Sequence, residues 1–156
     1  IRDLFLRTAA FFPKLLSFLS FSYPWNYSNG IIDNNLYPND VNGIIIPQPN
    51  LKLRVNDLPF DQYIGDEFAL LLFKCDHVFL EKINSLSNIN IFNNNIFQVD
   101  ENHIFNEDTD FFNWHNDKKL TAVIIKPDKH VYGAIKDSMK IENIEKLINK
   151  LHNDLY

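Results

Sequence analysis

The stretch that most constrains the fold is residues 120–135, which read LTAVIIKPDKHVYGAI. An apolar, β-branched run over residues 122–125 ends at the sequence KPDKH, and a second apolar run begins at Val131. Proline donates no hydrogen bond to a central strand ladder and aspartate tolerates turn geometry, so the chain is expected to reverse direction here. The pattern therefore predicts an antiparallel hairpin in the core.

The composition fits one compact domain with an appended segment. The chain has 156 residues, is 46% apolar and carries a net charge of −5, with an isoelectric point near 5.4. Its three arginines are too few for a phosphate-binding surface, so we expect no nucleic-acid partner. A single cysteine, Cys75, excludes an internal disulfide and fits a reducing, cytoplasmic compartment.

The first residues are strongly apolar, and they predict helices rather than a membrane span. Residues 1–21 are expected to form two short apolar helices that break at Pro13. The uninterrupted part, residues 15–23, is far shorter than the roughly 20 residues that cross a bilayer, so no membrane partner is predicted. Because the sequence begins at Ile1 without methionine, we expect a processed chain or a piece of a longer one.

Periodicity and turn signals predict an α/β fold for the rest of the chain. Residues 23–60 form a connector rich in proline, asparagine and aspartate. After it we expect helices over residues 58–65, 76–86, 108–116 and 141–155, and strands over 68–73, 88–92 and, as a further short strand, 96–99, besides the two hairpin strands. The order β-α-β-α-β-β-α is that of a thioredoxin fold, with a mixed sheet and helices on both faces.

Three short motifs resemble one protein family. Residues 126–133, KPDKHVYG, resemble the RPD-x-x-V-(Y/F)-G hairpin that closes the C-terminal thioredoxin-like domain of the flavin-dependent aromatic hydroxylases, with Lys126 in place of the usual arginine. These are the group A FAD monooxygenases, such as phenol and 3-(3-hydroxyphenyl)propionate hydroxylases. Residues 43–49, GIIIPQP, are similar to the G-x-x-x-P-Q-P segment that leads into that domain, and residues 58–65 are similar to its LDDLLG helix.

This resemblance implies a division of the chain and a role for it. Residues 1–57 would be a helical segment and connector from an upstream FAD and substrate portion, and residues 58–156 the thioredoxin-like C-terminal domain. The domain would be non-catalytic and inactive alone, packing as a scaffold against the upstream domains of the same polypeptide or in a homodimer. FAD and NAD(P)H would serve the parent enzyme, which would insert one oxygen atom into a phenolic ring.

The residues themselves offer no catalytic, cofactor-binding or metal site. The four glycines (Gly30, Gly43, Gly65 and Gly133) lie at least 13 positions apart, so they cannot form a loop that cradles a pyrophosphate. The histidines lack metal-ligand spacing; they are His77, His103, His115, His130 and His152. The acidic residues around His103 are interpreted as a solvated loop.

Two other functions stay open at this point. Cys75 follows the first central strand, where thioredoxins carry their thiols, so a free-standing thioredoxin-like redox protein is one alternative. Three features weigh against this alternative. The CxxC partner position of Cys75 is Val78, and the place of the usual cis-proline has the sequence Leu120-Thr121-Ala122. In addition, Asp76 would raise the pKa of a neighbouring thiol. The other alternative is a partner-binding module that uses residues 1–21. Tyr132 and Trp114 suit an interface, but core packing is favoured.

Overall fold

The computed structural model describes residues 31–33, 36–37, 40–47, 50–51, 58–99, 109–137 and 139–156. The helices predicted for residues 1–21 and the acidic loop around His103 lie outside these residues. The described part contains the whole hairpin, the four-stranded sheet and less than half of the connector over residues 23–60.

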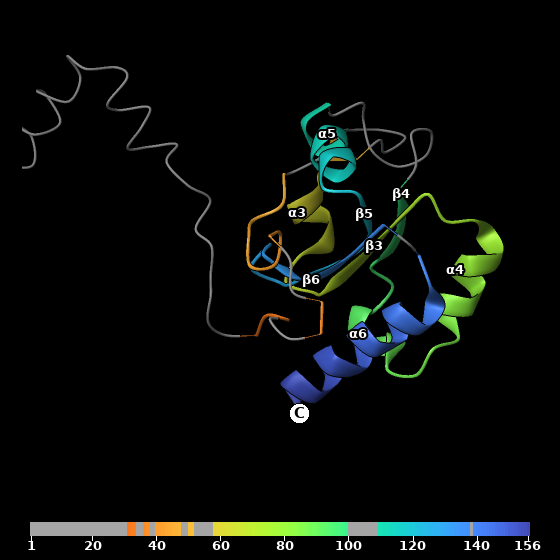
Figure 1. Cartoon of the computed structure of the whole chain (residues 1–156). Helices are drawn as coiled ribbons and strands as arrows, with labels where there is room; N and C mark the ends of the chain where they lie inside the picture. Colours follow the sequence, from red (N-terminus) through yellow and green to blue (C-terminus); the bar gives the residue numbers. More distant parts are fainter. Residues whose placement is uncertain are drawn as a thin grey trace, which may run out of the picture.

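A four-stranded mixed sheet forms the centre of the molecule (Figure 1). Its strands are β3 (Ala69–Phe73), β4 (Ile96–Val99), β5 (Leu120–Ile125) and β6 (Val131–Lys136), in the spatial order β4-β3-β5-β6. β3 and β4 run parallel, whereas β5 is antiparallel to both β3 and β6. This is the mixed sheet of a thioredoxin-like α/β fold, as the element order predicted.

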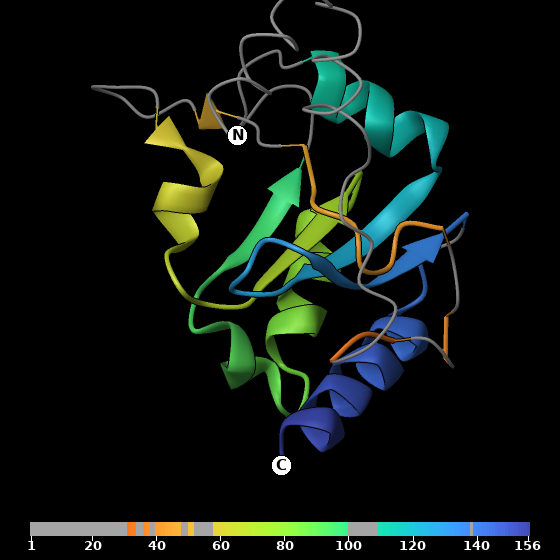
Figure 2. The ribbon, with the colours of Figure 1, turned by 90° about the vertical axis from the view of Figure 1, so that its left-hand side faces the viewer.

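Helices cover both faces of the sheet (Figure 2). α4 (His77–Asn84) and α6 (Ile141–Leu155) lie on one face, and α3 (Phe60–Ile64) and α5 (Thr109–Asp117) lie on the other. A separate pair of two-residue strands, β1 (Asn50–Leu51) and β2 (Leu58–Pro59), precedes α3. The predicted helix over residues 58–65 therefore begins later, at Phe60, directly after Pro59.

Alternation of side chains along β3 divides the core into two clusters. All five β3 residues are buried, since helices cover both faces. Leu71 and Phe73 join the cluster under α3 and α5, whereas Leu70 and Leu72 join the cluster under α4 and α6. The apolar run at residues 68–73 is thus explained by burial on both faces, as the sequence indicated.

The strand predicted for residues 88–92 is wrong. Ile89–Phe92 form a 3-10 helix, η1, and the second strand of the fold is Ile96–Val99, which had been expected as a further short strand. The asparagines on either side of η1, Asn88 and Asn93, have φ values of 63° and 54°. Asparagine adopts this left-handed conformation more readily than most residues, so the alternation of isoleucine and asparagine serves a tight turn and not a strand.

The hairpin between β5 and β6 is confirmed. The amide of Lys126 donates to the carbonyl of His130, and that of Lys129 donates back to Lys126, at 2.9 Å each. Ile124 pairs with Gly133, but Ile125 pairs with Val131, so Tyr132 is an extra residue at a β-bulge. The bulge places Tyr132 and Ile135 in the cluster under α6, and Val131 and Ala134 in the opposite cluster.

Gly133 has no room for a side chain. A Cβ atom there would lie 2.9 Å from Leu147 Cδ1 of α6 and 3.2 Å from Cβ of Asp33 in the connector. The missing side chain thus lets both α6 and the connector approach β6 closely.

We expect Gly133→Ala to lower the free energy of unfolding by about 1–3 kcal/mol, because the methyl group overpacks this junction. Chemical denaturation would measure the loss. In a Leu147→Ala background the cost of the same substitution should shrink, since one of the two obstructing side chains is gone. An equal cost in both backgrounds would contradict the steric explanation.

Candidate functional site

The position where thioredoxins carry a reactive thiol is closed in this protein. Cys75 lies between β3 and α4 and is only 8% exposed. The N-terminus of α4 is capped by Asp76, whose carboxylate accepts a hydrogen bond from the amide of Phe79 at 2.7 Å. An electropositive helix end stabilises a thiolate in redox proteins, but here it is occupied by a carboxylate. Val78, at the CxxC partner position, is exposed.

The four histidines that the structure describes do not come together. Within the described ranges, no three His, Cys, Asp or Glu side chains are placed to share a metal ion. His77 is exposed and faces Glu81, and His152 packs on the ring of Tyr156. His130 is part of the hairpin turn, where its Nδ1 atom lies 3.1 Å from the carbonyl oxygen of Asp128.

The two aromatic residues considered for an interface belong to the core. Tyr132 is fully buried, and its hydroxyl donates to Asp154 of α6 at 2.7 Å. Burial first, and then this hydrogen bond, raise the pKa of Tyr132, so the hydroxyl stays protonated. Trp114 is half-buried and its ring lies 5.9 Å from that of Phe111. Core packing, the favoured interpretation, is what the structure shows.

Residues 31–33, 36–37 and 40–47 of the connector form a segment, the strap, that pairs with the hairpin. The amide of Gly43 donates to the carbonyl of Val131, and the amide of Val131 donates to Ile44, both at 2.8 Å. Ile45 forms an antiparallel bridge with His130. The strap therefore covers part of the edge of the sheet that β6 would otherwise leave open.

Polar side chains fix the strap in place. Asp33 is fully buried, and its carboxylate accepts hydrogen bonds from the amides of Leu36 and Tyr37 at 2.8 and 2.7 Å. Its own amide donates to the carbonyl of Tyr132, at 2.8 Å. Further along the strap, hydrogen bonds from Lys118 and Lys136 lower the pKa of Asp40 to about 2. The strap is thus joined to β6 and to the turn before β5.

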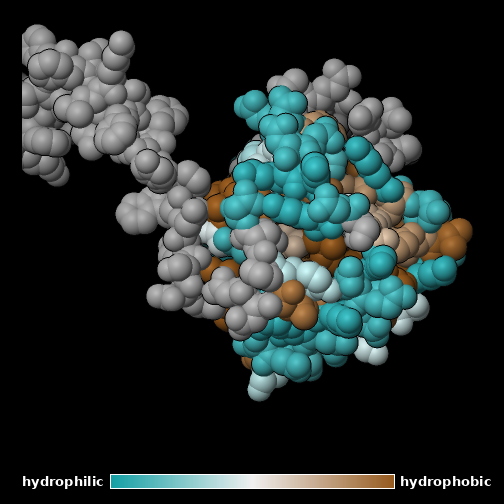
Figure 3. All heavy atoms as spheres, viewed as in Figure 1, coloured by the Kyte–Doolittle hydropathy of each residue, from teal (hydrophilic) through white to brown (hydrophobic). Residues whose placement is uncertain are grey.

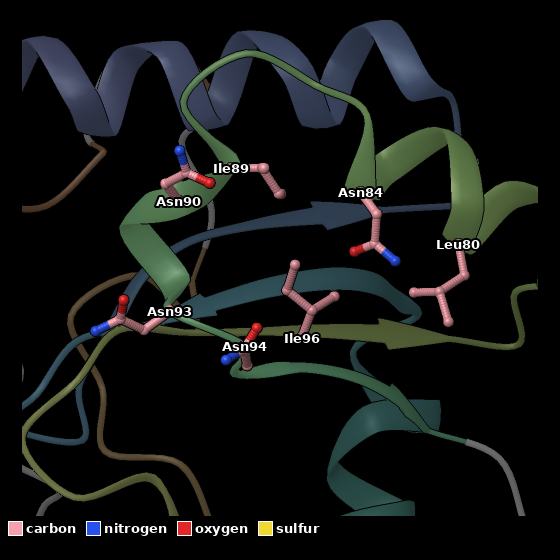
Figure 4. A pocket seen from close by; sticks show the side chains of 7 residues that line it. All are labelled: Leu80, Asn84, Ile89, Asn90, Asn93, Asn94 and Ile96. Atoms are coloured by element: carbon pink, nitrogen blue, oxygen red, sulfur yellow. The ribbon is translucent and has the colours of Figure 1, made fainter.

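A hollow of about 520 Å³ lies beside β4 (Figure 4). It is lined by residues of α4, η1, the turn after η1 and β4, namely Leu80, Asn84, Ile89, Asn90, Asn93, Asn94 and Ile96. Figure 4 shows Leu80, Asn84 and Ile96 gathered around the opening, whereas the amide of Asn93 points away from it. None of these seven residues is charged, so the hollow can receive an apolar group but offers no acid, base or nucleophile.

The molecular surface separates polar helices from apolar patches. Figure 3 shows hydrophilic surface over α5 and α6 and hydrophobic patches between these helices and near the strap. Three of the exposed large apolar residues belong to the strap, namely Ile31, Leu36 and Ile45. In the described part of the chain, no helix combines the length and apolarity needed to cross a membrane.

The fold is similar to parts of larger solved proteins. Aklavinone-11 hydroxylase in complex with FAD and aklavinone matches 72% of this chain with a TM-score of 0.54 and 12% identity, over 21% of its own length. RebC-10x, native and bound to K252c, matches 95% of this chain with a TM-score of 0.52 and 15% identity, over 28% of its own length. OxyS anhydrotetracycline hydroxylase from Streptomyces rimosus matches 96% of the chain at 13% identity, with a TM-score of 0.48.

These similarities, at such low identities, establish a shared fold. The chain spans between about a fifth and about three tenths of those proteins. No protein-family profile matches the sequence, and no curated protein is significantly similar to it. One of the proteins that share the fold, aklavinone-11 hydroxylase, was solved in a complex with FAD and aklavinone.

We expect Cys75 of the folded chain to react with iodoacetamide about two orders of magnitude more slowly than Cys75 of the urea-unfolded chain, because the thiol is buried. Mass spectrometry of samples quenched over time measures both rates. Rapid modification of the folded chain at pH 6 would show a reactive thiolate and contradict this interpretation.

Tyr132→Phe is expected to lower the free energy of unfolding by about 1–2 kcal/mol, since the hydroxyl bound to Asp154 is lost. Tyr63→Phe is a matched control, because Tyr63 is 47% exposed, and it should change stability by less than about 0.5 kcal/mol. Equal effects of the two substitutions in urea denaturation would show that the buried hydrogen bond does not stabilise the fold.

Proposed function

We propose that this chain is a non-catalytic, thioredoxin-like C-terminal domain of a flavin-dependent aromatic-ring monooxygenase. The observation that carries the proposal is the pairing of the strap with the hairpin. Two of the three motifs that resemble the hydroxylase family meet in space: Gly43 and Ile44 hydrogen-bond with Val131, more than eighty positions further along the chain. Motifs that fit together in space indicate one inherited unit more strongly than either motif does alone.

The closed thiol position supports a structural role. The chain has the sheet order of a thioredoxin-like fold, but Cys75 is buried and Asp76 occupies the end of α4. A disulfide that forms and breaks within the chain requires a second cysteine, and the sequence has none. These facts weigh against the alternative of a free-standing redox protein that uses Cys75.

The partners in this proposal are the upstream FAD and substrate domains of the same polypeptide. The strap is the part of the chain that would connect them to the sheet, and it carries exposed apolar side chains at Ile31, Leu36 and Ile45. Such residues favour contact with another protein surface over contact with water. A contact within a homodimer would use the same kind of surface. FAD and NAD(P)H would be bound by the parent enzyme in the cytoplasm, outside this chain.

A flavin-binding experiment tests this proposal. Titrating the chain into FAD should leave the flavin fluorescence unchanged, because its four glycines cannot form a pyrophosphate cradle. In the full polypeptide that contains the sequence before Ile1, FAD should co-purify, and a phenolic compound should stimulate NAD(P)H oxidation. Saturable, stoichiometric quenching by the chain alone would overturn the proposal, and so would a full polypeptide that holds no flavin.

A substitution of Cys75 tests whether the domain is non-catalytic. Cys75→Ser in the full polypeptide should leave the rate of NAD(P)H oxidation within about two-fold of the original, since a buried structural cysteine takes no part in the chemistry. A loss of activity in a variant that keeps its FAD and its fold would assign this domain a redox role.

A further inference from the structure

A second hollow, of about 390 Å³, opens at the carboxyl end of β3. Its walls come from the end of β3, the end of α5, the turn into β5 and the segment after β6. The lining residues that matter here are Phe73, Lys74, His115, Lys119, Leu120 and Asp137. This volume lies in the lower part of the range that pockets for small molecules occupy.

Among the described residues that line the hollow, the charged side chains leave an excess of one positive charge. Lys74 and Lys119 are exposed and contribute two ammonium groups, and Asp137 contributes one carboxylate. Among the described residues, the Lys74 amine has one long contact, 3.4 Å, with Oδ1 of Asn116. The chain as a whole has a net charge of −5, so a local positive excess is a distinct feature of this place.

The backbone that carries these charges is held in an unusual conformation. Lys74, Lys119 and Asp137 have φ values of 58°, 53° and 64°, where residues other than glycine are uncommon. The amide of Asp137 donates to the carbonyl of Lys119 at 3.0 Å, which joins two of the three segments. This hydrogen bond holds the backbone of Lys119 beside that of Asp137 at the rim of the hollow.

A buried histidine forms part of the wall. His115 is 5% exposed, and its ring stacks on Phe73, with 4.0 Å between ring centres and 14° between ring planes. Burial, and then the charge of Lys74, lower the pKa of His115 to about 4, and a hydrogen bond with the Leu120 backbone only partly opposes this. Among the described residues, its Nδ1 atom has no hydrogen-bond partner. At neutral pH the wall is therefore uncharged and largely aromatic at this point.

We propose that this hollow binds a small organic carboxylate, with its anionic group between Lys74 and Lys119 and its apolar part against Phe73 and Leu120. Two ammonium groups attract a monoanion, and the stacked rings with Leu120 offer apolar contact. A phosphate dianion fits less well, because the Asp137 carboxylate is at the same rim and the described lining includes no arginine to form a bidentate pair. This binding site goes beyond the scaffold role proposed above.

Phenylacetate is the probe for this site, because it combines a carboxylate with an apolar ring. Titrated into the full chain and followed by NMR, it should bind saturably, with a Kd of about 1 mM or tighter, and shift the amide signals of Lys74, Lys119 and Leu120. The neighbouring anion should also raise the pKa of His115 above about 4, which the imidazole C–H resonances would report. Phenylacetamide has a similar shape but no charge, and inorganic phosphate has the charge but no apolar part; both should bind at least about ten-fold more weakly.

Variants locate the site. Lys74→Met and Lys119→Met replace exposed residues with an unbranched neutral side chain, so the fold should persist while phenylacetate binds about ten-fold more weakly. Lys146→Met, on the exposed side of α6, is the matched control and should bind as the original chain does. The proposal is overturned by unchanged affinity in both lysine variants, by phenylacetamide or phosphate binding as tightly, or by no saturation up to about 10 mM.

Discussion

The burial of β3 is the constraint on which the rest of the structure depends. Each of its five residues is buried, and its two neighbours, β4 and β5, take up its hydrogen-bonding groups on both sides. A strand with no polar side chain can be stable in water only if other elements cover both of its faces, because exposed apolar surface costs about 25 cal/mol per Å². α4 and α6 must therefore cover one face, and α3 and α5 the other.

The two edge strands of the sheet, β6 and β4, have different neighbours. At β6, the strap pairs with the hairpin and places Asp33 against Gly133, so the upstream chain is joined firmly to the domain. At β4, an uncharged hollow lies beside the edge strand, and at the carboxyl end of β3 a charged hollow occupies the region where thioredoxins carry out redox chemistry. The fold thus keeps its architecture while its thiol position has become part of the core.

Much of the fold could be predicted because its strongest signals are local. The hairpin follows from a proline and an aspartate between two β-branched runs, and α6 follows from apolar residues at helical spacing, of which Ile144, Leu147, Ile148 and Leu151 are buried. The prediction for residues 88–92 failed since alternating isoleucine and asparagine suits both a strand and a tight turn. The structure has a turn here, because Asn88 and Asn93 adopt left-handed conformations and Phe92 is buried.

The sequence by itself determined the order of elements, the chemistry that is excluded and the motifs that resemble the hydroxylases, because these depend only on residue identity and spacing. A single cysteine and four scattered glycines exclude an internal disulfide and a glycine-rich nucleotide loop in any fold. Only the tertiary structure decided that the strap pairs with the hairpin, that Gly133 is squeezed between Asp33 and Leu147, and that Lys74, His115 and Lys119 surround one hollow. These contacts join residues that are far apart in the chain, and their closeness is set by how the sheet and its helices pack.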